Sequence, residues 1–119
     1  MNWIKRATRT LELESQAIAQ LVGQLDGTFE AVGQLILDRP GRVITTGIGK
    51  SAIIAQKLVA TFNSTGTPAV FMHAADAIHG DLGLIQSDDV VVCISKSGNS
   101  PEIKALTPLI KSRSIPLIG

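Results

Sequence analysis

The chain has 119 residues, of which 45% are hydrophobic and 3% aromatic, and its formal net charge is +1. This length allows one domain of ordinary size, and the near-neutral charge excludes the basic surface that nucleic-acid-binding proteins present. A single cysteine excludes an internal disulfide framework and fits a reducing compartment. We find neither an apolar run of about 18 residues nor a signal peptide, and therefore expect a soluble cytoplasmic protein.

The first 41 residues are predicted to be helical. Apolar side chains recur at helical spacing between residues 3 and 25, at Ile4, Ala7, Leu11, Ile18, Leu21 and Leu25. Gly27 marks a break, and a second, shorter helix then continues until Pro40-Gly41 ends it. We expect residues 1–41 to be an N-terminal helical segment that packs against its own domain or against a partner subunit.

From residue 42 onwards, predicted strands and helices alternate. The strands are expected at 43–46, 69–72, 89–94 and 115–118, and the helices at 51–63, 76–79 and 101–112. This rhythm predicts an α/β core over residues 42–119, with a parallel sheet and right-handed crossovers. A sheet that ends on a bare strand has an uncovered edge. We therefore expect a core that is incomplete at its C-terminus or is covered from elsewhere.

Three polar, glycine-containing segments leave the predicted strands on the same side of the sheet. They are residues 47–51, 73–83 and 95–102. Because ligands of open α/β sheets bind beyond the carboxyl ends of the strands, these segments are the expected site.

The third segment combines small hydroxyl side chains with the start of a helix. Ser95, Ser97, Asn99 and Ser100 surround Gly98, directly before Pro101. Hydroxyls and free N–H groups at a helix N-terminus favour an anion, and glycine lets the backbone approach it closely. The alternative is a capped helix, with Ser100 or Asn99 as N-cap and Glu102 completing a capping box. Capping explains one hydroxyl only, so we favour phosphate binding.

The first segment, GIGKSA, is not a P-loop, because Ile44 stands where that motif requires glycine. It fits a permissive dinucleotide-binding pattern, but the acidic residue expected after the second strand is missing. Lys50 is therefore the informative residue. It is either a solvated surface lysine or a cation that neutralises developing negative charge beside an anion.

The middle segment, HAADAIHGDLG, holds both histidines of the chain. Neither C-x-x-C nor H-E-x-x-H spacing is present, so we expect no metal site, and His73 is the one weak candidate for a ligand. His79 precedes Gly-Asp at the ligand edge and is the better catalytic candidate. Cys93 lies in a predicted strand and is expected to be an inert core residue.

The three segments together resemble the sugar isomerase (SIS) domain family of arabinose-5-phosphate isomerases. The resemblance lies in TTGIGKSAIIAQKLVATFNSTGTPAVF (45–71), HAADAIHGDLG (73–83) and ISKSGNSPEI (94–103). It implies a flavodoxin-like, three-layer αβα fold, C-terminally truncated here. It also implies an aldose–ketose isomerase that interconverts D-arabinose 5-phosphate and D-ribulose 5-phosphate for 3-deoxy-D-manno-octulosonate synthesis. Finally, it implies a homotetramer with a sugar-phosphate substrate and no cofactor, nucleic-acid or membrane partner.

Carried onto the matching positions, the resemblance makes Lys50, His79 and Glu102 the expected catalytic residues. The expected substrate- and phosphate-binding residues are Gly49, Ser51, Ser95, Ser97, Gly98, Asn99 and Ser100. Isomerisation through an enediolate requires a base that moves a proton between C1 and C2, and a partner for the enediolate oxygens. We expect Glu102 to be that base, Lys50 the electrostatic stabiliser, and His79 a ring-opening or proton-relay group.

Two other functions remain open at the level of sequence. SIS domains also occur as non-catalytic sugar-phosphate-binding modules in sensors and regulators, although residues 1–38 are too weakly basic for a DNA-binding region. A dinucleotide-binding oxidoreductase would depend on the glycine pattern of the first segment alone, so we consider it the weakest alternative.

Overall fold

The computed structural model describes residues 1–119, and its contacts divide them into two compact units, Met1–Gln34 and Leu35–Gly119. The second unit begins earlier than residue 42 because Leu35 and Ile36 pack against buried side chains of the sheet. Whether the helical segment of residues 1–41 and the core of residues 42–119 are separate domains stays a prediction.

The first unit is helical, as expected. Helix α1 spans Trp3–Leu21, and the short 3-10 helix η1 spans Val22–Gln24. Helix α2 begins at Gly27 and continues to Asp38. Helix α1 starts where it does because the Asn2 side chain accepts a hydrogen bond from the Lys5 N–H at 3.0 Å, which is an N-cap. No residue of α1 is buried, so its apolar side chains are left facing solvent.

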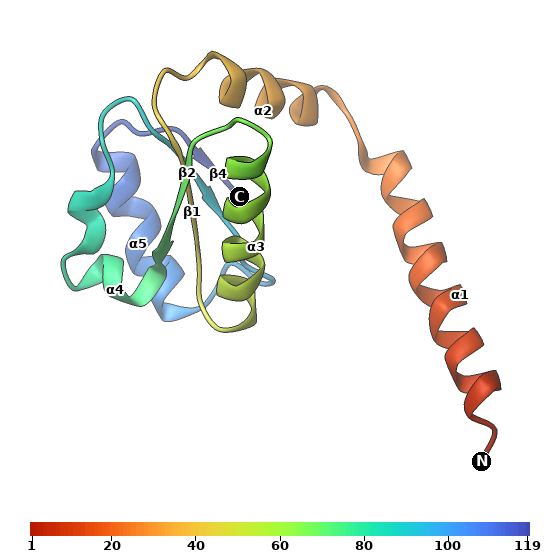
Figure 1. The fold of residues 1–119 in the computed structure, drawn as a ribbon. Helices are drawn as coiled ribbons and strands as arrows, with labels where there is room; N and C mark the ends of the chain where they lie inside the picture. Colours follow the sequence, from red (N-terminus) through yellow and green to blue (C-terminus); the bar gives the residue numbers. More distant parts are fainter. The chain divides into compact units, whose positions relative to one another are not determined.

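The second unit contains a four-stranded, all-parallel sheet (Figure 1). Its strands are β1 (Val43–Gly47), β2 (Ala69–His73), β3 (Val90–Cys93) and β4 (Leu117–Ile118), in the spatial order β2-β1-β3-β4. The predicted α/β class and parallel sheet are confirmed. Strand β1 lies between two neighbours and is buried at all five positions, because helices cover both of its faces.

Helices form the two outer layers. Helix α3 (Lys50–Ser64) covers one face of the sheet, while α4 (Ala74–Ile78) and α5 (Pro101–Ser112) cover the other (Figure 1). The 3-10 helix η2 (Asp81–Leu84) follows α4. One core cluster joins Ile44 and Val91 of the sheet to Leu106 and Ile110 of α5. No helix is both long and apolar enough to cross a membrane.

Candidate functional site

The three predicted segments begin together at the carboxyl edge of the sheet. Gly47 at the end of β1 pairs with His73 at the end of β2, and Thr46 pairs with Cys93 at the end of β3. Since neighbouring strands lie about 4.8 Å apart, the three segments leave the sheet side by side. The segment that carries Lys50 is the central one, because β1 lies between β2 and β3.

The first segment turns tightly from β1 into α3. A side chain at Gly47 would place its Cβ 3.0 Å from the Ser51 carbonyl carbon and 3.1 Å from both the Ala52 nitrogen and the Ile94 oxygen. Gly49 has a φ of 60°, which favours glycine, and it is the N-cap of α3 without a side-chain cap. Lys50, the first residue of α3, is exposed. The turn therefore presents an uncapped helix start and a cation at the edge of the sheet.

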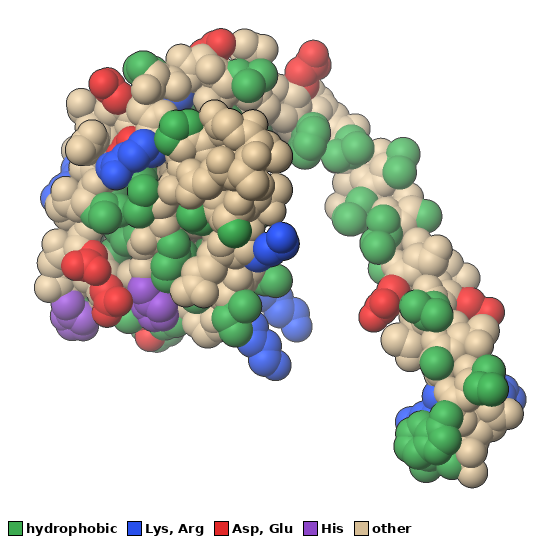
Figure 2. Space-filling view, viewed as in Figure 1, with side chains coloured by type: hydrophobic (Ala, Val, Ile, Leu, Met, Phe, Trp, Pro, Cys, Tyr) green, Lys and Arg blue, Asp and Glu red, His purple; other side chains and the backbone are tan.

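The middle segment presents His79 and holds His73 in place. His73 Nδ1 accepts a hydrogen bond from the Ala75 N–H at 3.2 Å and caps α4, whereas His79 is exposed at the other end of that helix. Both histidine side chains reach the molecular surface (Figure 2). Nowhere in the chain are three or more His, Cys, Asp or Glu side chains placed to hold a metal ion.

The third segment is shaped by its own serines. Ser95 Oγ accepts a hydrogen bond from the Gly98 N–H at 2.9 Å, and Ser97 Oγ accepts one from the Asn99 N–H at 3.2 Å. Gly98 adopts a φ of 68°, which glycine tolerates without strain. The alternative of a serine-capped helix is wrong in detail. Ser100 occupies the N-cap position of α5, but its hydroxyl makes no capping bond. Its oxygen is buried and has no hydrogen-bond partner.

The expected catalytic residues come from all three segments. Lys50 and His79 are exposed, and Glu102 is half-buried in the first turn of α5. A carboxylate in that turn is stabilised by the positive end of the helix dipole. Lys50 and Glu102 thus lie in the first turns of the helices that follow β1 and β3, and His79 lies at the end of the short helix that follows β2.

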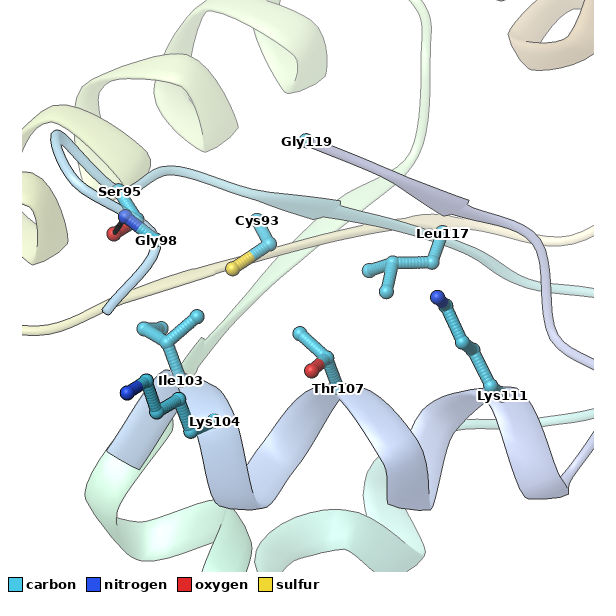
Figure 3. Close-up of a pocket in the computed structure, with 9 residues that line it drawn as sticks. All are labelled: Cys93, Ser95, Gly98, Ile103, Lys104, Thr107, Lys111, Leu117 and Gly119. Carbon is cyan, nitrogen blue, oxygen red and sulfur yellow. Dashed lines mark hydrogen bonds between the residues drawn. The ribbon is translucent and has the colours of Figure 1, made fainter. Parts of the chain in front are cut away.

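A cavity of about 510 Å³ lies between α5 and the β3–β4 side of the sheet (Figure 3). It begins at Ser95 and Gly98 of the third segment, and none of the three expected catalytic residues lines it. Thr107 and Lys111 extend from α5 towards the strands, while Cys93 points towards the helix. The rest of the lining is Ile103, Lys104, Leu117 and Gly119.

Sequence reasoning missed the polar residues of this cavity. Lys104, Thr107 and Lys111 follow one another at i, i+3 and i+7, which is the spacing of one helix face. The sequence signal that could have indicated this cavity was two lysines on the helix face that also carries Thr107. Without the tertiary structure, that face is indistinguishable from an ordinary solvated one.

Comparison with known proteins agrees with this fold. The SIS domain family matches residues 36–119. Over 119 residues, the chain is 44% identical to the arabinose 5-phosphate isomerase KdsD of Pseudomonas aeruginosa, covering 100% of this chain and 36% of that protein. It is 46% identical to the KdsD of Francisella tularensis, covering 98% and 36% respectively.

Among solved structures, the E. coli CFT073 protein c3406 in complex with arabinose 5-phosphate superposes with a TM-score of 0.91 at 39% identity. That alignment covers 98% of this chain and 64% of the E. coli chain. The chain thus spans about a third of the curated relatives and just under two thirds of the structural neighbour. By the extent of the family match and by this structural similarity, the chain belongs to the SIS domain family.

Proposed function

We propose that this chain binds a pentose phosphate and belongs to an isomerase that interconverts D-arabinose 5-phosphate and D-ribulose 5-phosphate. Two findings support the proposal: the relatives are named arabinose 5-phosphate isomerases, and the E. coli neighbour is in complex with arabinose 5-phosphate. The chain corresponds to 36% of the curated relatives, so the activity of the chain by itself is part of the proposal.

The observation that carries the proposal is the state of the α5 N-terminus. Ser100 holds the N-cap position, yet its hydroxyl leaves the first-turn N–H groups uncapped and is itself buried without a partner. A buried hydroxyl without a hydrogen bond is costly, and native structures seldom retain one without a reason. A phosphate group at this helix start would accept hydrogen bonds from the N–H groups and, after the Ser100 side chain rotates its oxygen out of its buried position, from the hydroxyl; the helix dipole would also favour it.

Calorimetric titration with arabinose 5-phosphate tests the phosphate site. Ser100→Ala is expected to weaken binding by about tenfold, because a hydrogen bond to a charged oxygen is lost. Ser112→Ala is the matched control, since Ser112 lies at the opposite end of α5 and bonds only to the Leu109 carbonyl. Equal affinities of the Ser100 variant and the unaltered chain would contradict the assignment.

The same site supports an enediolate mechanism. Glu102 takes the proton from one of the two carbons C1 and C2 and returns it to the other, so the carboxylate is regenerated at the end of the reaction. Lys50 stabilises the negative charge that develops on the enediolate oxygens. His79 donates and accepts a proton during opening of the sugar ring. This division of roles uses one residue from each of the three neighbouring segments.

Turnover and binding of a Glu102→Gln variant test the catalytic assignment. We expect turnover to fall by at least about a hundredfold, the usual contribution of general-base catalysis, while arabinose 5-phosphate affinity changes little. Glu30→Gln, which alters a carboxylate in the first turn of α2, is the control for the loss of one negative charge. Retained turnover in the Glu102 variant would refute the base role. Binding without turnover in the unaltered chain would favour the alternative, a non-catalytic sugar-phosphate-binding module.

The proposal extends to assembly and to place in metabolism. Ile4, Leu11 and Ile18 are 80%, 66% and 68% exposed along α1, and we assign this stripe to contacts within a homotetramer. Sedimentation tests this assembly: Leu11→Lys should reduce the mass in solution, whereas Gln16→Lys on the polar side of α1 should not.

We also propose that the protein acts in the cytoplasm. There, the arabinose 5-phosphate that it forms would feed 3-deoxy-D-manno-octulosonate and lipopolysaccharide synthesis.

A further inference from the structure

The two histidines of the chain flank one short helix, α4, at its two ends. His73 is the N-cap of α4 and His79 is its C-cap. Five residues are too few for a helix to be stable by its own hydrogen bonds. Helix α4 is held by its buried side chains Ala74 and Ala77 and by these caps. Its stability therefore depends on how each cap is made.

The N-terminal cap depends on one atom of His73. Its Nδ1 accepts the Ala75 N–H at 3.2 Å, and an imidazole nitrogen that accepts a hydrogen bond carries no proton. The neutral ring therefore has its proton on Nε2. Phe71 lies against the ring edge-on, with centroids 6.2 Å apart and planes at 86°. The backbone of His73 is also paired with Gly47 in the sheet, so both the tautomer and the position of the ring are set.

The C-terminal cap is made by backbone only. The His79 N–H donates to the carbonyl oxygens of Asp76 and Ala77, with the Asp76 oxygen 3.1 Å away. The His79 side chain is exposed, and the contacts that fix this residue are those of its backbone. Its location at the carboxyl edge of the sheet is therefore determined by whether α4 is folded.

We propose that His73 is a positioning residue, which caps α4 through Nδ1 and thereby holds His79 at the site edge. The effect of this positioning role on turnover rests on the proposed function, because His73 acts through His79. Neither metal ligation nor proton transfer by His73 is needed in this role. The Nδ1 atom is already committed to the Ala75 N–H.

Two substitutions separate the two ring nitrogens. Asparagine places an acceptor oxygen where Nδ1 stands and is a strong N-cap residue, whereas glutamine places its polar end where Nε2 stands. His73→Asn should keep the cap, and His73→Gln and His73→Ala should lose it. A lost cap opens a helix end by a factor of about five. We expect kcat to fall by up to about that factor in the Gln and Ala variants with little change in KM, and to be restored in the Asn variant.

Amide hydrogen exchange tests the positioning without relying on catalysis. In the full 119-residue chain, the Ala75 and His79 amides should exchange about fivefold faster in His73→Gln than in His73→Asn or the unaltered protein. Because the chain has only two histidines, imidazole ¹⁵N spectra can also be assigned to each ring. They should show the His73 proton fixed on Nε2.

The outcomes separate the two proposals. A proton on His73 Nδ1, or equal exchange of the His79 amide in the Asn and Gln variants, would overturn the positioning role whether or not the chain is active. Faster His79 exchange in the Gln variant with no turnover in any variant would support the positioning role and count against the isomerase. Full kcat in His73→Gln together with loss in His73→Asn would also overturn the positioning role and identify Nε2 as the atom that matters.

Discussion

Arg42 binds Asp89 through both its backbone and its side chain. The Arg42 N–H and Nε donate to Asp89 Oδ1 at 2.7 and 3.3 Å, and Nη2 donates to Oδ2 at 2.9 Å. The Gln86 N–H adds a bond to Oδ2 at 2.8 Å. Asp89 is only 1% exposed, so a buried carboxylate joins the start of β1 to the loop before β3, at the end of the sheet opposite the site.

Removing this carboxylate should destabilise the second unit. In Asp89→Ala the Gln86 and Arg42 N–H groups, both partly buried, lose their acceptor, and donors without partners cost up to about 1–3 kcal/mol each. We expect the free energy of unfolding, measured by urea titration, to fall by about 2–4 kcal/mol. Asp88→Ala, which alters an exposed neighbour, should change it by less than about 0.5 kcal/mol. Equal effects of the two substitutions would show that the network contributes no stability.

The same carboxylate should make stability depend on acid pH. Burial by itself would raise the pKa of Asp89, but hydrogen bonds from Arg42, and from the backbone N–H groups of Gln86 and Arg42, hold it below its ordinary value. Because the folded-state pKa is lowered, Asp89 contributes fully to the free energy of unfolding above the unfolded-state pKa, about 3.9. This contribution is lost as the pH falls through the folded-state pKa.

Urea midpoints measured at about pH 5, 4 and 3 check this sign. The unaltered chain should lose stability over both steps, and Asp89→Asn should lose less, because an amide does not titrate. A pH dependence identical in the two proteins would assign the acid sensitivity to other carboxylates.

A side chain at Gly47 should be costly. Its Cβ would approach backbone atoms of Ser51, Ala52 and Ile94 at 3.0–3.1 Å, and backbone cannot move aside as a flexible side chain can. Gly47→Ala is expected to cost about 1–3 kcal/mol and to displace the turn that carries Lys50, weakening sugar-phosphate binding. Gly83→Ala is the control, because open space surrounds that position. Thermal unfolding and titration of both variants measure the difference.

Cys93 should react slowly with alkylating reagents. Burial raises the pKa of its thiol, and only the thiolate is nucleophilic. At about pH 7 we expect alkylation of the native chain to be at least about tenfold slower than in urea. Since Cys93 is the single cysteine, one mass increment measures the rate. Equal rates in buffer and in urea would show that the β3 side of the cavity is open to reagents.

Much of the fold followed from local pattern. The alternation of apolar strands with helices predicted the parallel sheet, and the helix expected at 101–112 forms over those residues. Predicted strand ends were less accurate. Strand β3 is Val90–Cys93 rather than 89–94, because Asp89 turns its carboxylate to Arg42 and the ladder begins after it.

By itself, the sequence determined the α/β class, the three polar segments and the residues that could carry chemistry, because these depend on spacing along the chain. Only the tertiary structure decided which polar atoms are already engaged. Ser100 has no capping bond, His73 Nδ1 is committed to Ala75, and Lys111 lines a cavity. The partner of a polar atom depends on the side-chain rotamer and on which element packs against it, and spacing along the chain specifies neither.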